Sequence, residues 1–355
     1  MDRVNILGAG VIGLYTGYIL LKRGYQVSIY DPAPILGLGA SGRNAGVLHI
    51  IQRPFNSLKS LLALEGAKLH RILSGEVGYE ILDKRLYILA RNSVEKIYLN
   101  MIAMLLHRRG YSVEKVYRDR LEDKEFLSKD IQLGIRIEGY GVVEPMEMLH
   151  SLYKALQEEG GEVKLSMEAD PAELDGYIVI AAGHRSYELG ASLGDQPPRH
   201  RLSLGVMLET NIPLENMYTV PPTPIHRHTK GGAIIPRKEC TVVGPGFRWV
   251  DDTSQKPRDE DVESIKRRFQ PLLSREITVE KVVHGFRTIN LPHDDFIIRR
   301  RGRHILLYGI DSPGLTAAPA IGYLVAWLIK ADDNNISISR DIAKKIITRA
   351  DTHIS

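Results

Sequence analysis

The first 31 positions alternate apolar strand-like runs with one apolar helical run. Residues 4–7 form a mainly apolar run, with Asn5 as its one polar residue, and lead into G-x-G-x-x-G at positions 8–13; an apolar helical run follows from Leu14 to Leu21. A second apolar run at 26–30 ends on Asp31. This order predicts a strand–helix–strand unit with a glycine turn after its first strand.

Each part of this unit has a mechanical task at a dinucleotide. Gly8 permits a tight turn, Gly10 lets the backbone approach a pyrophosphate, and Gly13 lets the helix pack closely on the strand. The helix N-terminus offers N–H groups to phosphate oxygens, and Asp31 can accept hydrogen bonds from ribose hydroxyls. The unit therefore predicts dinucleotide binding; the alternative is a glycine-rich turn in an ordinary α/β domain.

The rest of the chain is predicted to contain further strands and helices of this nucleotide-binding type, separated by segments with other patterns. Helical patterns are predicted at 58–73, 94–109, 146–157, 258–269 and 319–329, and strands at 84–90, 163–165, 177–183 and 304–309. Between residues 202 and 283 short strand-like pieces alternate with turns, as in an antiparallel sheet. Residues 111–136 are charged and mixed. Nucleotide-type segments at the start, middle and end predict two interleaved domains.

Composition narrows the class of protein. At 355 residues the chain is long for one hydrophobic core, and 43% hydrophobic with 25% charged residues is typical of a soluble globular protein. A net charge of +4 is mild; it fits an anionic substrate or a weak preference for membrane surfaces and does not suggest nucleic-acid binding. The single cysteine, Cys240, excludes a disulfide framework and any four-cysteine iron–sulfur or zinc site.

The N-terminal segment and the longest apolar stretch bear on the expected cellular location of the protein. Because the glycine pattern begins so early, we expect no signal peptide, and residues 320–329 are too short an apolar stretch to span a bilayer. We therefore expect a cytoplasmic protein, at most peripheral to the inner face of the membrane. Few Gln, one Cys and many Ile, Arg and Glu residues are typical of proteins from thermophiles.

Two further segments favour a flavin over a nicotinamide. Residues 39–49 have mostly small side chains, so the backbone of such a loop could lie directly against a flat ring system. Residues 308–316 lead from a buried strand into a helix, whose first N–H groups could stabilise negative charge at the N1–C2=O edge of a reduced flavin. These features predict FAD as the cofactor.

The chain resembles the FAD-dependent D-amino-acid oxidase superfamily in the order of its short motifs. Within it, the chain is most similar to the branch of L-2-hydroxyglutarate dehydrogenase and FAD-dependent glycerol-3-phosphate dehydrogenase. The motifs that carry the resemblance lie at 44–49, 57–66, 141–145, 242–252, 285–287 and 294–298, and residues 309–321 match almost throughout. The similarity covers most of residues 1–330 in order. The cysteine-rich C-terminal extension of some glycerol-3-phosphate relatives has no counterpart.

The resemblance implies an α/β (α+β) fold class. A glutathione-reductase-like FAD-binding Rossmann domain would be interleaved with a substrate domain whose antiparallel sheet covers the flavin. The FAD-binding domain would comprise residues 1–76, 143–200 and 291–355. The substrate-binding domain would comprise residues 77–142 and 201–290.

The resemblance also implies which residues hold the cofactor. At the pyrophosphate and ribose these are Gly8, Gly10, Val11, Ile12, Gly13 and Asp31. Along the phosphates and ring they are Ser41, Arg43, Asn44, Ala45, Gly46 and Val47. Ala182 and Gly183 would pass nearby, and the pyrimidine edge would meet Gly309, Asp311, Pro313, Gly314, Leu315 and Thr316. The adenine-side contact stays open between Glu168 and Ala169.

Oxidation of an alcohol or amine carbon needs an anchor for the anionic substrate and a route for its proton. Arg287 is the candidate anchor, since a guanidinium can grip a carboxylate or phosphate with two hydrogen bonds; the alternative is a surface or interdomain ion pair. His49 follows the ring-lining loop and is the candidate proton acceptor. The alternatives for His49 are a packing role or a covalent link to the flavin.

Two other histidines and a lysine are weaker candidates. His226 and His228 alternate on a predicted strand and so share a face, which suits a substrate pocket or a polar surface. Since no third and fourth ligands accompany them, we predict no metal. Lys59 is expected on a solvated helix face.

Together these features predict an FAD-dependent dehydrogenase or oxidase. It would oxidise a CH–OH group of a small anionic substrate, either a 2-hydroxy acid such as L-2-hydroxyglutarate or glycerol-3-phosphate, by hydride transfer to flavin N5. The alternatives are an amine-oxidising glycine or D-amino-acid oxidase type and a non-catalytic flavin-bearing partner subunit. The electron acceptor (oxygen, a quinone or a carrier protein), stereochemistry and oligomeric state stay open.

Overall fold

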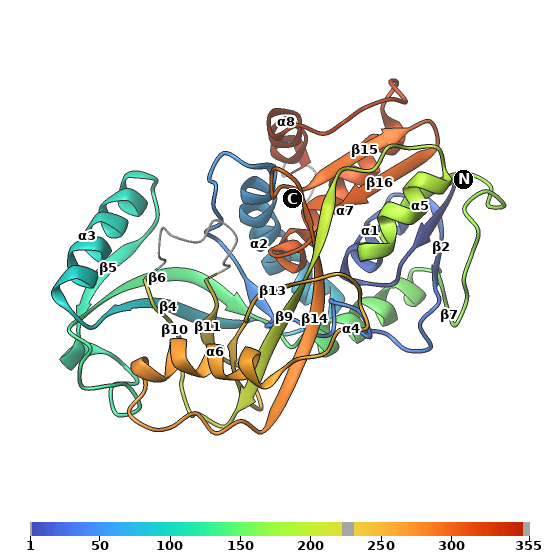
Figure 1. Cartoon of the computed structure of the whole chain (residues 1–355). Helices are drawn as coiled ribbons and strands as arrows, with labels where there is room; N and C mark the ends of the chain where they lie inside the picture. The colour runs from blue at the N-terminus through green and yellow to red at the C-terminus, as the bar shows by residue number, and fades with distance from the viewer. Residues whose placement is uncertain (1, 222–230, 351–355) are drawn as a thin grey trace.

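The computed structural model describes residues 2–221 and 231–350, and two sheets organise it (Figure 1). The first, of six strands, has the order β15-β16-β8-β1-β2-β7. Its strands are β1 (Arg3–Leu7), β2 (Gln26–Asp31), β7 (Glu162–Leu165), β8 (Tyr177–Ile180), β15 (Ile297–Arg301) and β16 (His304–Tyr308). All pairs are parallel except β15 with β16. This sheet is the scaffold of a Rossmann-type fold.

Helices cover both faces of this sheet. On one face pack α1 (Val11–Leu21), α2 (Leu58–Val77), α4 (Pro145–Glu158), α7 (Gly314–Lys330) and α8 (Arg340–Ala350), and on the other α5 (Ser186–Ser192). Alternate residues of one strand serve the two faces. Val179 of β8 joins the core under α1 and α7, whereas Ile178 and Ile180 pack toward Tyr187 of α5.

The second sheet has ten strands within the described residues. Its strands are β3 (Val47–Leu48), β4 (Leu82–Ala90), β5 (Val113–Tyr117), β6 (Leu133–Val142), β9 (His200–Thr210), β10 (Met217–Thr219), β11 (Ala233–Pro236), β12 (Thr241–Gly244), β13 (Arg248–Val250) and β14 (Lys281–Asn290). Antiparallel pairing dominates, and only β10 runs parallel to its neighbour β4. Helix α3 (Ser93–Arg108) packs on one face and α6 (Asp259–Phe269) on the other.

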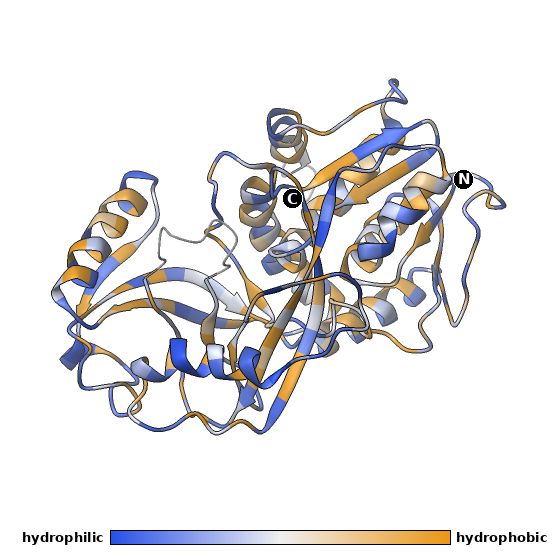
Figure 2. Ribbon diagram, viewed as in Figure 1, coloured by the Kyte–Doolittle hydropathy of each residue, from blue (hydrophilic) through white to orange (hydrophobic). Residues whose placement is uncertain are grey.

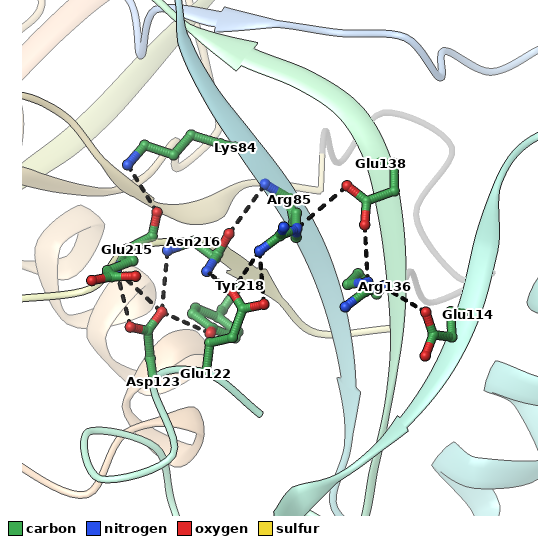
Figure 3. Close-up of polar contacts among 10 residues, drawn as sticks. All are labelled: Lys84, Arg85, Glu114, Glu122, Asp123, Arg136, Glu138, Glu215, Asn216 and Tyr218. Carbon is green, nitrogen blue, oxygen red and sulfur yellow. Dashed lines mark hydrogen bonds and ion pairs between the residues drawn. The ribbon is translucent and has the colours of Figure 1, made fainter. Parts of the chain in front are cut away.

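A polar cluster fixes the parallel pair β4–β10 (Figure 3). The carboxylate of Asp123 accepts hydrogen bonds from the backbone N–H groups of Glu215 and Asn216, each at 3.1 Å, and from the Tyr218 hydroxyl at 2.7 Å. Arg85 of β4 pairs with Glu122 at 2.7 Å. Since none of these residues lines the cavity described below, the cluster is a structural support.

The predicted fold class is confirmed, and most predicted elements lie where expected. The predicted segments include no counterpart of β3, β5, β6, α5, α8 or β15. Helix α7 begins at Gly314, five residues before the predicted start at 319. The domain boundaries stay a prediction; the structure adds that β3, from the first predicted FAD-binding segment, pairs with β6 of the second sheet. His226 and His228 lie outside the described residues.

Candidate active site

A cavity of about 1770 Å³ lies between the two sheets, at the carboxyl ends of the parallel strands. Ligands of open parallel sheets bind at this edge. The first sheet supplies the ends of β1, β2, β8 and β16 with the loops that follow them. The second supplies residues of β4, β9, β10, β11 and β14.

The turn after β1 is built without side chains. Gly8 has φ +113°, and a Cβ on it would lie 2.4 Å from the carbonyl oxygen of Ala181. A Cβ on Gly13 would lie 1.9 Å from the Gly8 carbonyl oxygen, so this glycine lets α1 pack on the turn. Gly10 is the N-cap of α1, and Val11 donates its N–H to the Ser41 hydroxyl at 3.0 Å. At Gly8 and Gly10, therefore, the backbone reaches the cavity without a side chain.

Asp31 closes this turn from the end of β2. Its carboxylate accepts the N–H of Ala9 at 2.8 Å and that of Ala33 at 2.9 Å. Asp31 and the first turn of α1 both line the cavity. The acid thus shapes the glycine turn and also offers oxygens at the position where a ribose is bound in such folds.

The loop of residues 39–47 is held by its own polar groups. The Asn44 amide donates to the Ser41 carbonyl at 2.5 Å, and the Gly46 N–H donates to the Asn44 side-chain oxygen at 2.8 Å. Gly46 has φ +75°, and a Cβ there would lie 2.1 Å from the Val143 carbonyl oxygen. The loop therefore lies flat along the cavity wall.

The start of α7 forms the far end of the same wall. The Thr316 hydroxyl accepts the His49 N–H at 3.0 Å and donates to the Val47 carbonyl at 3.2 Å, so it ties this helix to the loop before it. A Cβ on Gly66 of α2 would lie 2.0 Å from the Thr316 carbonyl oxygen, which brings α2 and α7 close together. Gly314 and Leu315 of this first turn line the cavity. The Gly314 N–H is bound to the Asp311 carbonyl, whereas the N–H groups that follow it in the first turn have no acceptor within the helix.

A buried network holds this first turn from below. His70 of α2 lies 2.9 Å, through Nε2, from the Leu315 carbonyl oxygen, and its Nδ1 lies 2.8 Å from the Tyr79 hydroxyl. Tyr15 adds a contact of 2.6 Å to Tyr79. Burial lowers the pKa of His70 to about 4, so the ring is neutral at physiological pH and donates from Nε2 to the carbonyl.

Arg287 enters the cavity from β14 over a glycine. A Cβ on Gly205 of the paired strand β9 would lie 2.2 Å from Arg287 Nη2, so this glycine makes room for the guanidinium. Nη2 donates to the Gly246 carbonyl at 3.3 Å, whereas the buried Nη1 has no hydrogen-bond partner among the described residues. Burial lowers the pKa of Arg287, and the charges of Asp311 and Asp294 partly offset this. A guanidinium stays charged in such a setting.

Lys59 is buried, in contrast to the solvated position expected from the sequence. Its ammonium pairs with Asp311 at 2.6 Å and with Asp294. Burial by itself lowers the pKa of Lys59, but the charges of Asp311 and Asp294 outweigh it and raise the pKa above its ordinary value. Asp295 caps α2 beside them by accepting the N–H groups of Leu58 and Lys59 at 2.9 and 2.8 Å. The Asp311 side chain therefore serves the lysine.

His49 lines the cavity and is half-buried. Its ring lies edge-on to that of Tyr140, with centroids 6.3 Å apart. Because its backbone N–H is bound to Thr316, the ring is carried at a fixed point of the wall that also holds α7. His49 and Arg287 thus share one cavity although 238 positions separate them in the chain.

The structure brings most predicted site residues to this cavity. Those that line it are Gly8, Gly10, Val11, Ile12, Asp31, Ser41, Arg43, Asn44, Ala45, Gly46, Val47, His49, Ala182, Gly183, Arg287, Asp311, Pro313, Gly314, Leu315 and Thr316. Gly13 lies behind the wall, and so does Gly309, where a Cβ would lie 2.2 Å from the amide nitrogen of Asn290. Glu168 and Ala169, the two candidates for the adenine side, both line the cavity.

Sequence reasoning missed three residues of the site. Lys59 is a buried cation that pairs with Asp294 and Asp311, and Gly205 makes room for Arg287. One signal for Lys59 was present, because it stands between Leu58 and the apolar residues Leu61 and Leu62 in the first turn of α2. For metal binding, no group of three or more His, Cys, Asp or Glu side chains in residues 2–221 and 231–350 could hold an ion.

A Rossmann-type sheet, a bare glycine turn and a large cavity at the strand ends define a dinucleotide-binding protein. The chain belongs to the FAD dependent oxidoreductase family, whose model matches residues 3–328. It is an FAD-dependent enzyme, which confirms the resemblance and the cofactor predicted from the sequence. Across the described residues, no helix combines the length and apolar character needed to cross a membrane.

Individual relatives agree with this family. Glycerol 3-phosphate oxidase from Mycoplasma genitalium is 23% identical, over 90% of this chain and 92% of the relative. The mitochondrial L-2-hydroxyglutarate dehydrogenase of Arabidopsis thaliana is 37% identical over 29% of this chain and 22% of its own length. Among solved structures, the FAD-bound L-alpha-glycerophosphate oxidase from Mycoplasma pneumoniae superposes with a TM-score of 0.81 at 22% identity, covering 95% of this chain and 97% of that one.

A solved amine-oxidising relative has nearly the same fold. Glycine oxidase from Geobacillus kaustophilus gives a TM-score of 0.78 at 22% identity, over 93% of this chain and 95% of that one. The shared architecture therefore does not by itself choose between an alcohol and an amine as substrate.

The residues of this cavity fit FAD. Bare backbone at Gly8 and Gly10 leaves a cradle that a Cβ would fill, and the first turn of α1 offers N–H groups for a pyrophosphate. The loop 39–47 and the first turn of α7 supply flat walls for a ring system. The cofactor, when bound, supplies a two-electron hydride acceptor.

Proposed function

We propose that the protein oxidises the CH–OH group of a small anionic substrate, a 2-hydroxy acid such as L-2-hydroxyglutarate or glycerol-3-phosphate. The observation that carries the proposal is the buried Arg287 Nη1, which has no partner among the described residues. Since a buried donor without a partner is costly, an anionic group in the cavity is its natural acceptor. The names of the glycerol 3-phosphate oxidase and L-2-hydroxyglutarate dehydrogenase relatives support the substrate class.

The contrast with Lys59 supports the same assignment. Lys59 is neutralised by two carboxylates. Arg287 has no ion pair among the described residues, so its guanidinium can bind a carboxylate or phosphate with two hydrogen bonds. In this proposal Arg287 holds the anionic end of the substrate and His49 accepts the hydroxyl proton as the hydride leaves carbon. The predicted roles of the other lining residues toward FAD belong to the same proposal.

The substrate class can be tested by anaerobic reduction of the bound flavin. The FAD-loaded protein is mixed with glycerol 3-phosphate, L- and D-2-hydroxyglutarate, glycine and D-alanine, and with glycerol as the uncharged control. We expect loss of the visible flavin absorbance with one of the anionic alcohols and none with glycerol. Bleaching by an amino acid with ammonia release would instead identify an amine oxidase, and no bleaching at all would favour a non-catalytic subunit.

The anchor can be tested by Arg287→Met. Losing hydrogen bonds from a charged donor is expected to raise KM for the anionic substrate by about 10- to 100-fold. FAD content should be unchanged, because the guanidinium serves the substrate. Arg85→Met is the matched control, since Arg85 lies on the same sheet outside the cavity. An unchanged KM in Arg287→Met would remove this residue from the site.

A further inference from the structure

Helix α3 presents apolar side chains on the side that faces away from its sheet. Five of them are 44% to 77% exposed: Val94, Ile97, Met101, Met104 and Leu105. Their spacing of three and four residues places them along one side of the helix. This set is called the α3 outer face.

The opposite side of the same helix is also apolar. Leu99, Ala103 and Leu106 are buried against the second sheet. A surface helix of a monomeric protein usually carries polar residues on its outer side. Figure 1 shows α3 at the outer end of the second sheet, and Figure 2 shows hydrophobic residues along it. The apolar character of the outer face is therefore not explained by packing within this chain.

We propose that the α3 outer face docks the protein onto an anionic lipid surface. This inference does not depend on the substrate proposed above. An amphipathic helix of this kind lies in the plane of the interface with its apolar side about 5–10 Å below the headgroups.

The charges around the face are complementary to anionic lipids. Lys96, Arg108 and Lys115 lie on α3 and on the adjacent strand β5, and no ion pair involves them within the described part of the chain. The two acids of residues 91–117, Glu95 and Glu114, are each paired with an arginine at 2.9 and 2.6 Å. The region is therefore positive, and each such cation near an anionic surface contributes about 1 kcal/mol.

The size of the face favours a lipid surface over a second copy of the chain. A stable protein interface takes about 800 Å² and 20–30 residues from each partner. The outer face offers five side chains over residues 94–105, roughly 16 Å of helix. A bilayer accepts such a narrow stripe. Because Arg109 follows α3 and lines the cavity, docking would also place the cavity beside the lipid surface.

Vesicle sedimentation of the FAD-loaded full chain tests the proposal. Vesicles of phosphatidylcholine alone are compared with vesicles that also contain phosphatidylglycerol. We expect the protein to sediment with the anionic vesicles and to be partly released by high salt. The double variant Ile97→Glu/Met101→Glu should lose at least about tenfold in partition, since two apolar side chains no longer leave water.

The matched control is Ile72→Glu, which changes an exposed apolar residue of α2. It should sediment like the wild type, and all variants should keep the wild-type FAD content and circular dichroism. The proposal is overturned if the wild type stays in solution or if the double variant sediments equally. Analytical ultracentrifugation showing a dimer that the double variant abolishes would assign the face to a second copy instead.

Discussion

The two walls of the cavity are built by different means. The wall from the first sheet consists of backbone and small residues: the glycine turn after β1, the loop 39–47 and the first turn of α7. The facing wall presents side chains such as Arg287, supported by pairing between strands far apart in sequence. In the proposed function, the first wall binds FAD by shape and N–H groups, and Arg287 of the second wall selects an anionic substrate by charge. We therefore expect changes in the first wall to affect cofactor retention and changes in the second to affect turnover.

A side chain added to the glycine turn of the backbone wall should abolish FAD binding. Gly10→Val adds a side chain at the N-cap of α1, where even a Cβ would lie 3.0 Å from the Ser41 hydroxyl oxygen. We expect a folded but colourless protein, measured by visible absorbance against total protein. Gly39→Ala is the control, because Gly39 lines the same cavity and its Cβ would meet nothing within 4 Å. A yellow Gly10→Val protein would show that this turn does not hold the cofactor.

This wall was also the part that the sequence predicted well. The spacing of Gly8, Gly10 and Gly13, with Asp31 ending the next strand, is a local pattern whose geometry follows from a few neighbouring residues. The strand-to-helix turn at 308–316 was recognised in the same way, although the helix after it was predicted to start only at 319. Gly309 is the exception, since its lack of a Cβ makes room for the Asn290 amide behind the wall rather than for a ligand in the cavity.

Contacts between distant parts of the chain were predicted less completely than the local turn. Lys59 looks like a solvated helix residue until Asp294 and Asp311, more than 230 positions away, are placed beside it. Strand β5 has the sequence Val-Glu-Lys-Val-Tyr, whose polar residues face solvent at the edge of a sheet, so its hydrophobic pattern is weak. Such an edge strand forms because it pairs with a neighbouring strand, and this pairing is not visible in its own sequence pattern.

His49 lines the cavity from the backbone wall, but changing its side chain should lower turnover rather than cofactor content. His49→Gln keeps a polar side chain of similar reach but cannot accept a proton, so we expect kcat to fall by about 10²- to 10⁴-fold. FAD content should stay near that of the wild type, because the His49 N–H to Thr316 is a backbone contact. Stopped-flow reduction of the flavin separates this step from reoxidation. An unchanged rate of reduction would leave His49 as a packing residue.

The buried ion pair ties α2 to the segment that precedes α7, and breaking it should cost stability. Lys59→Met leaves the buried Asp311 and its neighbour Asp294 without their shared cation. Removing one partner of such a pair destabilises a protein by about 3–5 kcal/mol. Denaturant unfolding measures the loss, and Lys68→Met, which removes an exposed pair on the same helix, is the control. If both variants lose the same small amount, Lys59 is not a structural link.

The smallest effect is expected from the network beneath the backbone wall. The pKa of His70 is about 4 in the folded chain, against an ordinary value of 6.5. The unfolded chain therefore binds a proton at this residue as pH falls through 6.5, while the folded chain does so only near 4. The stability that His70 contributes is present above pH 6.5 and is lost between 6.5 and 4, by roughly 3 kcal/mol in total.

The variant His70→Gln isolates the pH-dependent contribution of His70 to the free energy of unfolding. A glutamine amide can still donate to the Leu315 carbonyl and accept from Tyr79, but it does not titrate. Unfolding free energies of wild type and variant are measured from pH 7.5 to about 4.5, so that carboxylate effects common to both cancel. The difference between them should shift in favour of the variant as the pH falls. Parallel curves would mean that His70 binds protons alike in the folded and unfolded chains, so that its burial does not lower its pKa.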